Sequence, residues 1–142
     1  MKKNFYKILA ITFCFTFLMS SGIDESQSLK VAQNVFKEFN IQREYPFDVS
    51  SVNVIREDSH PLLYIYNLFP KGFIIIAADD RTFPYIGYSF KNNFSLDAMP
   101  TNLSFVINNY KENILSNILN NVPESNQILN QWEKYLSDNV SE

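Results

Sequence analysis

The longest apolar run in the central part of the chain extends from Phe73 to Ala78. Six residues are too few for a helix, and the β-branched isoleucines favour a strand that is buried on both faces. Asp79 and Asp80 follow the run, and Pro84 cannot donate to a central ladder, so the chain is predicted to turn there. Tyr85 to Phe90 then predicts a second strand, and together the two strands form an antiparallel hairpin.

Two further strands are predicted ahead of this hairpin. Residues 51–56 alternate valine with polar residues, which is the period of a half-buried strand. Residues 62–69, LLYIYNLF, are rich in the aromatic and β-branched residues that suit a pleated surface. Polar or Pro/Gly turns at 56–61 and 69–72 connect the strands. Four strands joined by short turns predict an antiparallel meander.

Helical periodicity flanks the strands on both sides. Asp24, with Gln27 three residues later, is a candidate N-cap for a helix from Glu25 to Asn40. Its predicted apolar stripe comprises Leu29, Ala32, Val35, Phe36 and Phe39.

Two more helices are predicted after the last strand. The first is capped by Thr101 or Asn102 and ends before Pro123, which can occupy the first turn of the second. The apolar stripe of the first contains Leu103, Val106, Ile107, Tyr110, Ile114 and Ile118, and that of the second Ile128, Leu129, Trp132, Tyr135 and Leu136. We therefore expect an α+β fold in which a four-stranded antiparallel sheet packs with one N-terminal helix and a C-terminal helical hairpin.

The N-terminus has the features of a secretory signal peptide. Three lysines precede an apolar run from Ile8 to Met19, and small residues follow it up to Gly22. We expect cleavage after Gly22, an exported product in the periplasm or outside the cell, and a single domain over residues 23–142. The alternative is a retained membrane anchor, although the run is short for a bilayer.

Charge and cysteine content narrow the possible functions. Removing the three leader lysines changes 12 basic against 15 acidic residues into 9 against 15, and this acidic balance disfavours nucleic acid as a partner. Cys14 is the only cysteine and lies within the leader run. The mature protein is thus expected to hold no disulfide and no cysteine nucleophile, and to fold as a monomer without cofactor or metal.

Few residues carry candidate chemistry. His60 is the only histidine, and zinc sites draw on several His or Cys, so an ordinary turn residue is the favoured interpretation. Asp79 and Asp80 are a candidate cation site or acid/base pair, but capping of the turn is favoured because no further carboxylate cluster accompanies them. The aromatic run from Tyr64 to Phe94 is interpreted mainly as core. Gly87 is expected to lie where another part of the chain approaches closely.

The stretch from Gly72 to Phe90, GFIIIAADDRTFPYIGYSF, resembles the prodomain of streptopain, a papain-like secreted cysteine peptidase, and the small Spi-type inhibitors built on it. Gly72, Phe73, Gly87 and Tyr88 belong to this motif. The stretches 99–103, MPTNL, and 110–114, YKENI, are similar to the helix that follows the hairpin in that family. The resemblance extends over about residues 28–136.

The resemblance implies a protein that inhibits a streptopain-like cysteine peptidase by occupying its cleft. Prodomains of this family cover the active site of the mature enzyme, so loops at one end of the sheet are expected to face the partner. The implied partner-binding residues are Asp79, Asp80, Arg81, Phe83, Pro84 and Tyr85. Arg81 and Tyr85 are expected to be exposed anchors, because Arg and Tyr are common in interface hot spots.

Three other functions stay open at this point. The fold can serve as a binding or folding-helper module without inhibitory activity, or it can be the non-functional N-terminal remnant of a truncated peptidase. An enzyme of another class is the weakest alternative, because the mature chain has no cysteine, one histidine and no catalytic spacing.

Overall fold

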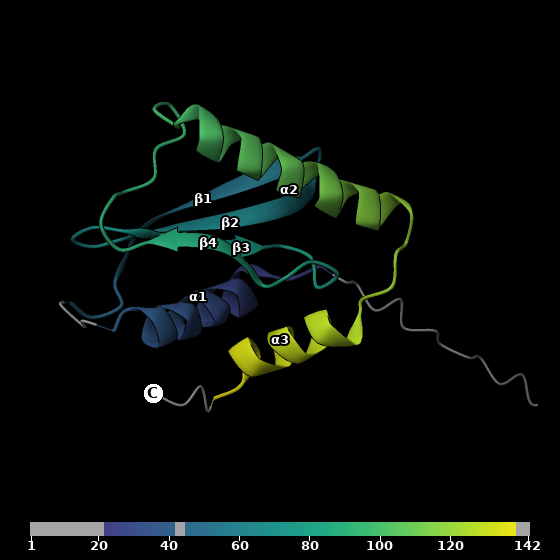
Figure 1. Cartoon of the computed structure of the whole chain (residues 1–142), viewed down its shortest axis with the longest axis horizontal. Helices are drawn as coiled ribbons and strands as arrows, with labels where there is room; N and C mark the ends of the chain where they lie inside the picture. Colours follow the sequence, from purple (N-terminus) through teal and green to yellow (C-terminus); the bar gives the residue numbers. More distant parts are fainter. Residues whose placement is uncertain (1–21, 42–44, 139–142) are drawn as a thin grey trace, which may run out of the picture.

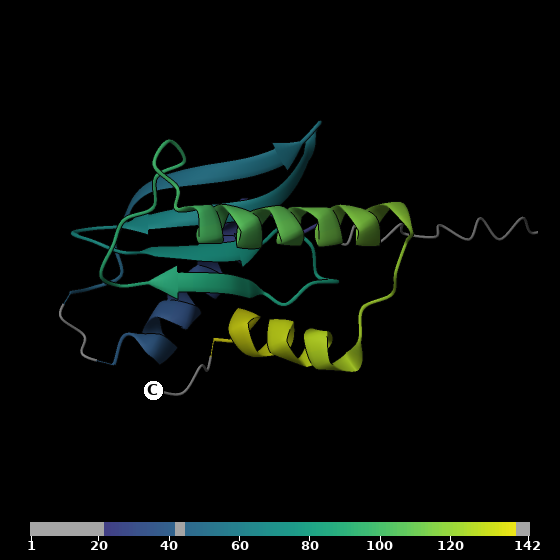
Figure 2. The same cartoon turned by 45° about the horizontal axis from the view of Figure 1, so that its top comes forward.

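The computed structural model describes residues 22–41 and 45–138. These residues form three layers, with one sheet as the middle layer (Figure 1). In chain order the elements are α1 Glu25–Phe39, β1 Val49–Glu57, β2 His60–Leu68, β3 Phe73–Ala77, β4 Tyr85–Ser89, α2 Thr101–Leu119 and α3 Asn126–Leu136. Helices α1 and α3 lie on one face of the sheet, and α2 lies on the other (Figures 1 and 2). The α+β class is therefore confirmed.

The sheet is an antiparallel meander with strand order β1-β2-β3-β4, as predicted. The two central strands form the core: Ile74 to Ala77 are each at most 1% exposed, and Leu62 to Tyr66 are also buried. β1 is an edge strand and is more exposed, with Val52 at 36%. The turn predicted over residues 56–61 is shorter than expected, since β1 continues to Glu57 and β2 begins at His60.

Helix α1 begins as the sequence predicts. The Asp24 carboxylate accepts the backbone N–H of Gln27 at 2.8 Å, and the Gln27 side chain accepts the N–H of Asp24 at 3.1 Å. This reciprocal pair is a capping box, which satisfies two donors that the first helical turn leaves free. The predicted stripe is shifted, because Leu29 is 40% exposed whereas Val31 is fully buried. The buried arc is wider than one stripe because α1 packs between the sheet and α3.

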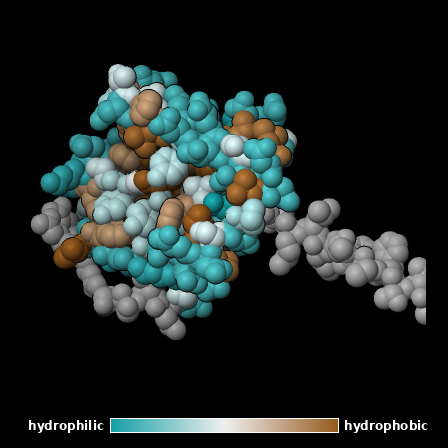
Figure 3. All heavy atoms as spheres, turned by 45° about the vertical axis from the view of Figure 1, so that its right-hand side comes forward, coloured by the Kyte–Doolittle hydropathy of each residue, from teal (hydrophilic) through white to brown (hydrophobic). Residues whose placement is uncertain are grey.

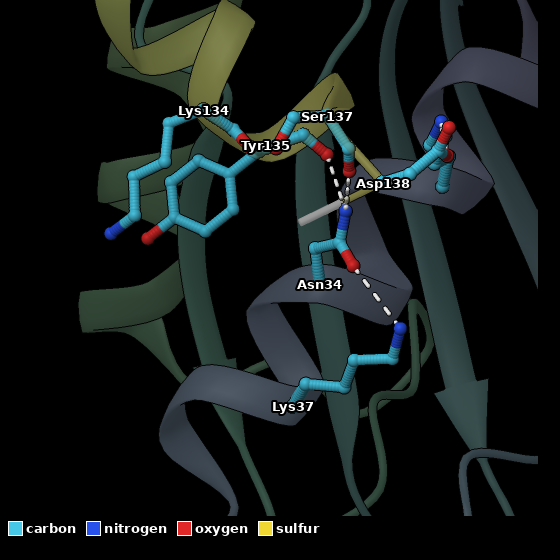
Figure 4. A network of polar contacts seen from close by, with 7 residues as sticks. Asn34, Lys37, Lys134, Tyr135, Ser137 and Asp138 are labelled. Carbon is cyan, nitrogen blue, oxygen red and sulfur yellow. Dashed lines mark hydrogen bonds and ion pairs between the residues drawn. The ribbon is translucent and has the colours of Figure 1, made fainter. Parts of the chain in front are cut away.

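Polar contacts join α1 to the C-terminal end of α3 (Figure 4). The Asn34 amide, 3% exposed, donates to the carbonyl oxygens of Tyr135 at 2.7 Å and Ser137 at 3.1 Å. These carbonyls belong to the last helical turn, where no intrahelical donor exists. At the surface, Lys134 pairs with Glu38 at 2.8 Å. The Asn34 side chain of α1 therefore caps the C-terminal end of α3.

The two C-terminal helices are present, but the prediction that they form a helical hairpin is wrong. α2 covers the opposite face of the sheet from α3, and residues 120–125 run between the two faces (Figure 1). Ile107 and Ile114 are the buried residues of α2, whereas Phe105 is 66% and Leu119 is 74% exposed. α2 is thus attached to the sheet by a narrow apolar contact.

The predicted ends of these helices need two corrections. Pro100, which has no side-chain donor or acceptor, precedes the first turn of α2, so neither Thr101 nor Asn102 caps it. α3 starts at Asn126, where the Ser125 hydroxyl accepts the N–H of Ile128, and Pro123 lies in the connection rather than in the helix. Serine is a strong N-cap, which explains the later start.

The backbone around Gly72, and not that around Gly87, leaves no room for a side chain. Gly72 has φ +113°, and a Cβ there would lie 2.7 Å from the Ser89 carbonyl oxygen and 3.2 Å from Phe90 Cα. A Cβ on Gly87 would meet nothing within 4 Å. The expectation of a close neighbour at Gly87 is wrong, because Gly87 pairs with Ile75 on the sheet face that α2 covers only in part.

Substitution of the two glycines should therefore have opposite outcomes. Gly72→Ala should lower the free energy of unfolding by about 1–3 kcal/mol, through backbone strain and the clash with the Ser89 carbonyl. Gly87→Ala should change it by less than about 0.5 kcal/mol. Urea unfolding of both variants and the parent tests this. Equal losses at the two positions would contradict the register of β3 and β4.

Candidate functional site

The β3–β4 loop, residues 78–84, is built around a buried ion pair. The Arg81 guanidinium donates to both carboxylate oxygens of Asp79, from Nε at 2.8 Å and from Nη2 at 2.6 Å. The Arg81 backbone N–H also donates to Asp79 Oδ1 at 3.0 Å, which closes a local turn. The Arg81 side chain is 8% exposed and that of Asp79 2%. Turn capping by Asp79 is confirmed, whereas the expected exposure of Arg81 is wrong.

The same loop is bonded to both C-terminal helices. Arg81 Nη1 donates to the carbonyl oxygen of Asn117 in α2 at 3.2 Å. This cation lies near the C-terminal end of α2, where it interacts favourably with the helix dipole, and the last turn of α2 has no basic residue of its own. The Trp132 indole of α3 donates to the carbonyl oxygen of Thr82 at 2.8 Å. One short loop therefore connects the sheet to helices on both of its faces.

The N-terminal entry of the domain joins this end of the sheet as well. Gly22 forms an isolated antiparallel bridge with Asp79, and the Ile23 N–H donates to the Ala78 carbonyl oxygen at 2.9 Å. The Tyr64 hydroxyl donates to the Ile23 carbonyl oxygen at 3.1 Å. Residues 1–21 of the predicted signal peptide lie outside the described residues. The cleavage after Gly22 stays a prediction.

The exposed part of the loop is apolar. Phe83 is 41% exposed, whereas its neighbours Thr82 and Pro84 are buried. The Pro84 carbonyl oxygen accepts the N–H of Ala77 at 3.0 Å, so the backbone on either side of Phe83 is fixed. Figure 3 brings this end of the molecule forward and shows brown apolar side chains at the surface among hydrophilic ones. Phe83 is the side chain that the loop presents.

Tyr85 belongs to an aromatic cluster rather than to the exposed loop. Its ring lies 5.5 Å from that of Phe39, 6.4 Å from that of Tyr88 and 5.4 Å from that of Tyr135. Tyr85 is half-buried, so its truncation would disturb the packing of α1 and α3 on β4. The expectation that Tyr85 is a freely exposed anchor is wrong. The partner-binding role of the loop residues stays a prediction.

The remaining motif residues lie on the strands. Phe73 packs edge-on against Phe94 at 5.6 Å, and Tyr88, 39% exposed, stacks on Phe39 at 4.8 Å. Thr82, Asn117 and Trp132 were not predicted as site residues. Two of them act through backbone carbonyls, which no sequence pattern marks. Trp132 is the only tryptophan, and a buried indole N–H requires an acceptor, which is the one available signal.

A hollow of about 480 Å³ lies beside the loop. Its lining includes His60, Tyr64, Asp79, Arg81 and Ile118. His60 is exposed at the start of β2 rather than in the turn where it was expected. Within residues 22–41 and 45–138, no three His, Cys, Asp or Glu residues are arranged to hold a metal ion. No helix in this part of the chain is long and apolar enough to cross a membrane.

Asp80 is an acidic residue of the loop whose carboxylate is not fully hydrogen-bonded. Its Oδ1 atom is buried without a hydrogen-bond partner. Burial, together with the nearby negative charges of Asp79 and Glu124, raises the pKa of Asp80 from 3.8 to about 6, and Arg81 opposes this only in part. The charged carboxylate is therefore disfavoured in the folded state.

The raised pKa of Asp80 predicts that the free energy of unfolding falls as the pH rises from about 4 to about 6. Because the folded pKa is higher than the unfolded one, the cost of ionising Asp80 is absent below about pH 4, develops between about pH 4 and 6, and is complete above about pH 6. Asp80→Asn should be more stable than the parent at pH 7.5, and this advantage should shrink at pH 4.5. Urea unfolding at both pH values measures it. An advantage that is the same at both would rule out ionisation as its cause.

Removal of the Arg81 side chain should destabilise the fold. Arg81→Ala leaves the Asp79 carboxylate buried without its partner, which typically costs about 3–5 kcal/mol. Arg56→Ala is the matched control, because Arg56 is exposed on the edge strand and should change stability by less than about 0.5 kcal/mol. The measurement is the free energy of unfolding in urea. Similar values for Arg81→Ala and the parent would show that the pair is dispensable.

The sequence of this chain is similar to a family of protease inhibitors and to part of a thiol protease. The sequence model of the Spi protease inhibitor family matches residues 20–114. The thiol protease/hemagglutinin PrtT of Porphyromonas gingivalis is 30% identical over an alignment of 125 residues, and the alignment covers 82% of this chain and 14% of that protein. The chain thus spans a small part of that relative's length. No solved structure matches the chain.

Proposed function

The chain belongs to the Spi protease inhibitor family, and on that premise we propose that it inhibits a streptopain-like thiol peptidase by occupying its active-site cleft. Membership of an inhibitor family confirms the prediction that this domain is not an enzyme. The similarity to a thiol protease supports a partner of that class. The proposed inhibitor acts after export, as a monomer formed by residues 23–142.

The observation that carries this proposal is the rigid display of Phe83. The loop backbone is fixed before Phe83 by the Trp132–Thr82 hydrogen bond and after it by the Ala77–Pro84 hydrogen bond. A side chain that is already held in place loses little conformational entropy when it docks. An exposed aromatic residue in such a position is typical of an interface anchor. Phe83 therefore replaces Arg81 and Tyr85 as the proposed centre of the contact.

The same anchoring supports a loop that a bound peptidase does not cleave. A papain-like peptidase attacks a peptide carbonyl with a cysteine thiolate, so the bound segment has to adapt to the catalytic geometry. The carbonyl oxygens of Thr82 and Pro84 are already engaged in the loop's own hydrogen bonds. Attack at either carbonyl would require its hydrogen bond to break. We propose that the loop is bound without being processed.

A second candidate function is favoured by the length of the matched relative. The aligned region makes up 14% of a thiol protease, which supports a folding-helper role toward a peptidase domain. Refolding of a denatured streptopain-like peptidase with and without this protein tests that role. A higher yield of active peptidase without inhibition of the native enzyme would favour the folding helper over the inhibitor.

The inhibitor proposal predicts that Phe83→Ala weakens inhibition without unfolding the domain. Truncation of an interface anchor typically costs about 2 kcal/mol or more, which is about thirtyfold in affinity. The matched control is Phe105→Ala, because Phe105 is 66% exposed on α2, far from the loop in sequence. The inhibition constant against a streptopain-like peptidase and the melting temperature are measured for both variants.

The two failures of this experiment are distinct. If the parent inhibits and Phe83→Ala inhibits equally well, the contact lies elsewhere on the domain. If the parent inhibits no streptopain-like peptidase, the inhibitor proposal itself is wrong. A loss of inhibition that is equal in Phe105→Ala would show that exposed phenylalanines contribute without regard to their position.

A further inference from the structure

The β3–β4 loop shares one end of the molecule with the β1–β2 turn and with the connection between α2 and α3 (right in Figure 1). The Ala78 N–H donates to the carbonyl oxygen of Leu62, close behind the β1–β2 turn, at 2.9 Å. On the other face of the sheet, Arg81 donates to the Asn117 carbonyl oxygen near the end of α2 at 3.2 Å. We call this part of the surface the loop end. It comprises residues 57–60, 79–84 and 119–125.

Apolar side chains are exposed at the loop end. Phe83 is 41% exposed, Leu119 74% and Val122 39%. Phe83 belongs to the β3–β4 loop, whereas Leu119 ends α2 and Val122 lies in the connection that follows it. Protein interfaces have an apolar centre and a polar rim. The loop end supplies apolar side chains for such a centre from two separate segments.

Carboxylates surround these apolar side chains in all three segments of the loop end. They belong to Glu57 and Asp58 at the β1–β2 turn, Asp80 in the loop and Glu124 in the connection. Glu57, Asp58 and Glu124 are exposed, and within residues 22–41 and 45–138 none of the three forms an ion pair. The dipole of α3 favours Glu124 at the start of that helix, but Glu57 and Asp58 cap no helix.

The cations near the loop end do not balance these charges. Arg81 is almost fully buried and donates twice to the Asp79 carboxylate, so this pair neutralises itself inside the domain. Arg56, which adjoins the β1–β2 turn, is exposed. The lysines of the described residues all belong to other segments of the chain. The loop end therefore presents a negative potential around an apolar centre.

We propose that the loop end docks onto a peptidase whose cleft has an apolar pocket bordered by lysine and arginine side chains. Phe83 occupies the pocket, and the carboxylates of the loop end face the basic border. This inference rests on the proposed function and adds the charge of the partner to it. Complementary charges at the rim of an interface mainly accelerate association. They also disfavour contact between the loop ends of two copies of this chain, because like charges would then face each other.

The salt dependence of association tests this inference. The probe is an active streptopain-like peptidase, and its association and dissociation rate constants with this protein are measured by stopped-flow or surface plasmon resonance. The association rate constant should fall about tenfold or more between about 0.02 and 0.5 M salt, because salt screens the attraction between exposed charges. The dissociation rate constant should change much less, since it depends mainly on the apolar contact.

Two matched double variants separate the loop end from net charge. Glu57→Gln with Asp58→Asn removes two negative charges, and asparagine tolerates the left-handed backbone of position 58, where φ is +51°. This variant should associate about threefold more slowly at low salt, with an unchanged melting temperature. Asp97→Asn with Glu112→Gln removes the same charge from exposed positions before and within α2, and should change neither rate. Glu124→Gln should also slow association.

Failure of this inference and failure of the inhibitor proposal give different results. If the parent inhibits the peptidase but salt does not slow association, or if the two double variants associate at the same rate, the acidic surface takes no part in docking. That result overturns this inference and leaves the inhibitor proposal intact. If the parent inhibits no streptopain-like peptidase, both are overturned.

Discussion

The structure depends most on the ion pair between Asp79 and Arg81. Both side chains are almost fully buried, and two parallel hydrogen bonds join them. Buried ion pairs often add little net stability compared with apolar residues, because both charges lose their hydration. Their effect is to penalise every arrangement in which one charge stays buried without the other. The pair therefore specifies one conformation of the β3–β4 loop, and with it the positions of the segments that contact the loop.

Three parts of the chain rely on that loop for their attachment. The N-terminal entry pairs with Ala78 and Asp79, α2 is contacted by Arg81 at Asn117, and α3 is held through Trp132 and Thr82. α2 needs this contact in particular, because only two of its residues, Ile107 and Ile114, are buried against the rest of the domain. For an inhibitor-family domain, the consequence is a loop that is stiff at its base and apolar at its tip. The structural role of Asp79 and Arg81 and the proposed recognition role of Phe83 thus fall on neighbouring residues of one motif.

Prediction from the sequence succeeded for features that depend on a single helix, strand or turn. The isoleucine run, the alternating strands and the Asp24–Gln27 capping box predicted β3, the meander and the start of α1 correctly, because these features depend on local periodicity and local hydrogen bonds. It failed where the outcome depends on packing between distant elements. Periodicity shows that α2 and α3 each have an apolar face, but not that they cover opposite faces of the sheet.

The candidate site shows the same division. Asp79 was expected to cap the turn, and it does so. The burial of Arg81 depends on Asn117, which is 36 positions away, so the residue type suggested an exposed anchor when it is an internal one. Gly72 and Gly87 are both plausible sites of close approach, and only the three-dimensional position of the Ser89 carbonyl distinguishes them.

The central claim, that the Asp79–Arg81 pair holds the loop rigidly against the helices, has a direct probe. Trp132 is the only tryptophan, so its indole N–H gives a single NMR signal, and that proton is bonded to the Thr82 carbonyl oxygen. Hydrogen exchange of this one proton measures how often the loop opens. The structure predicts slow exchange in the parent and much faster exchange when Arg81 is replaced by Met. Exchange in the parent as fast as that of a free indole would contradict the account.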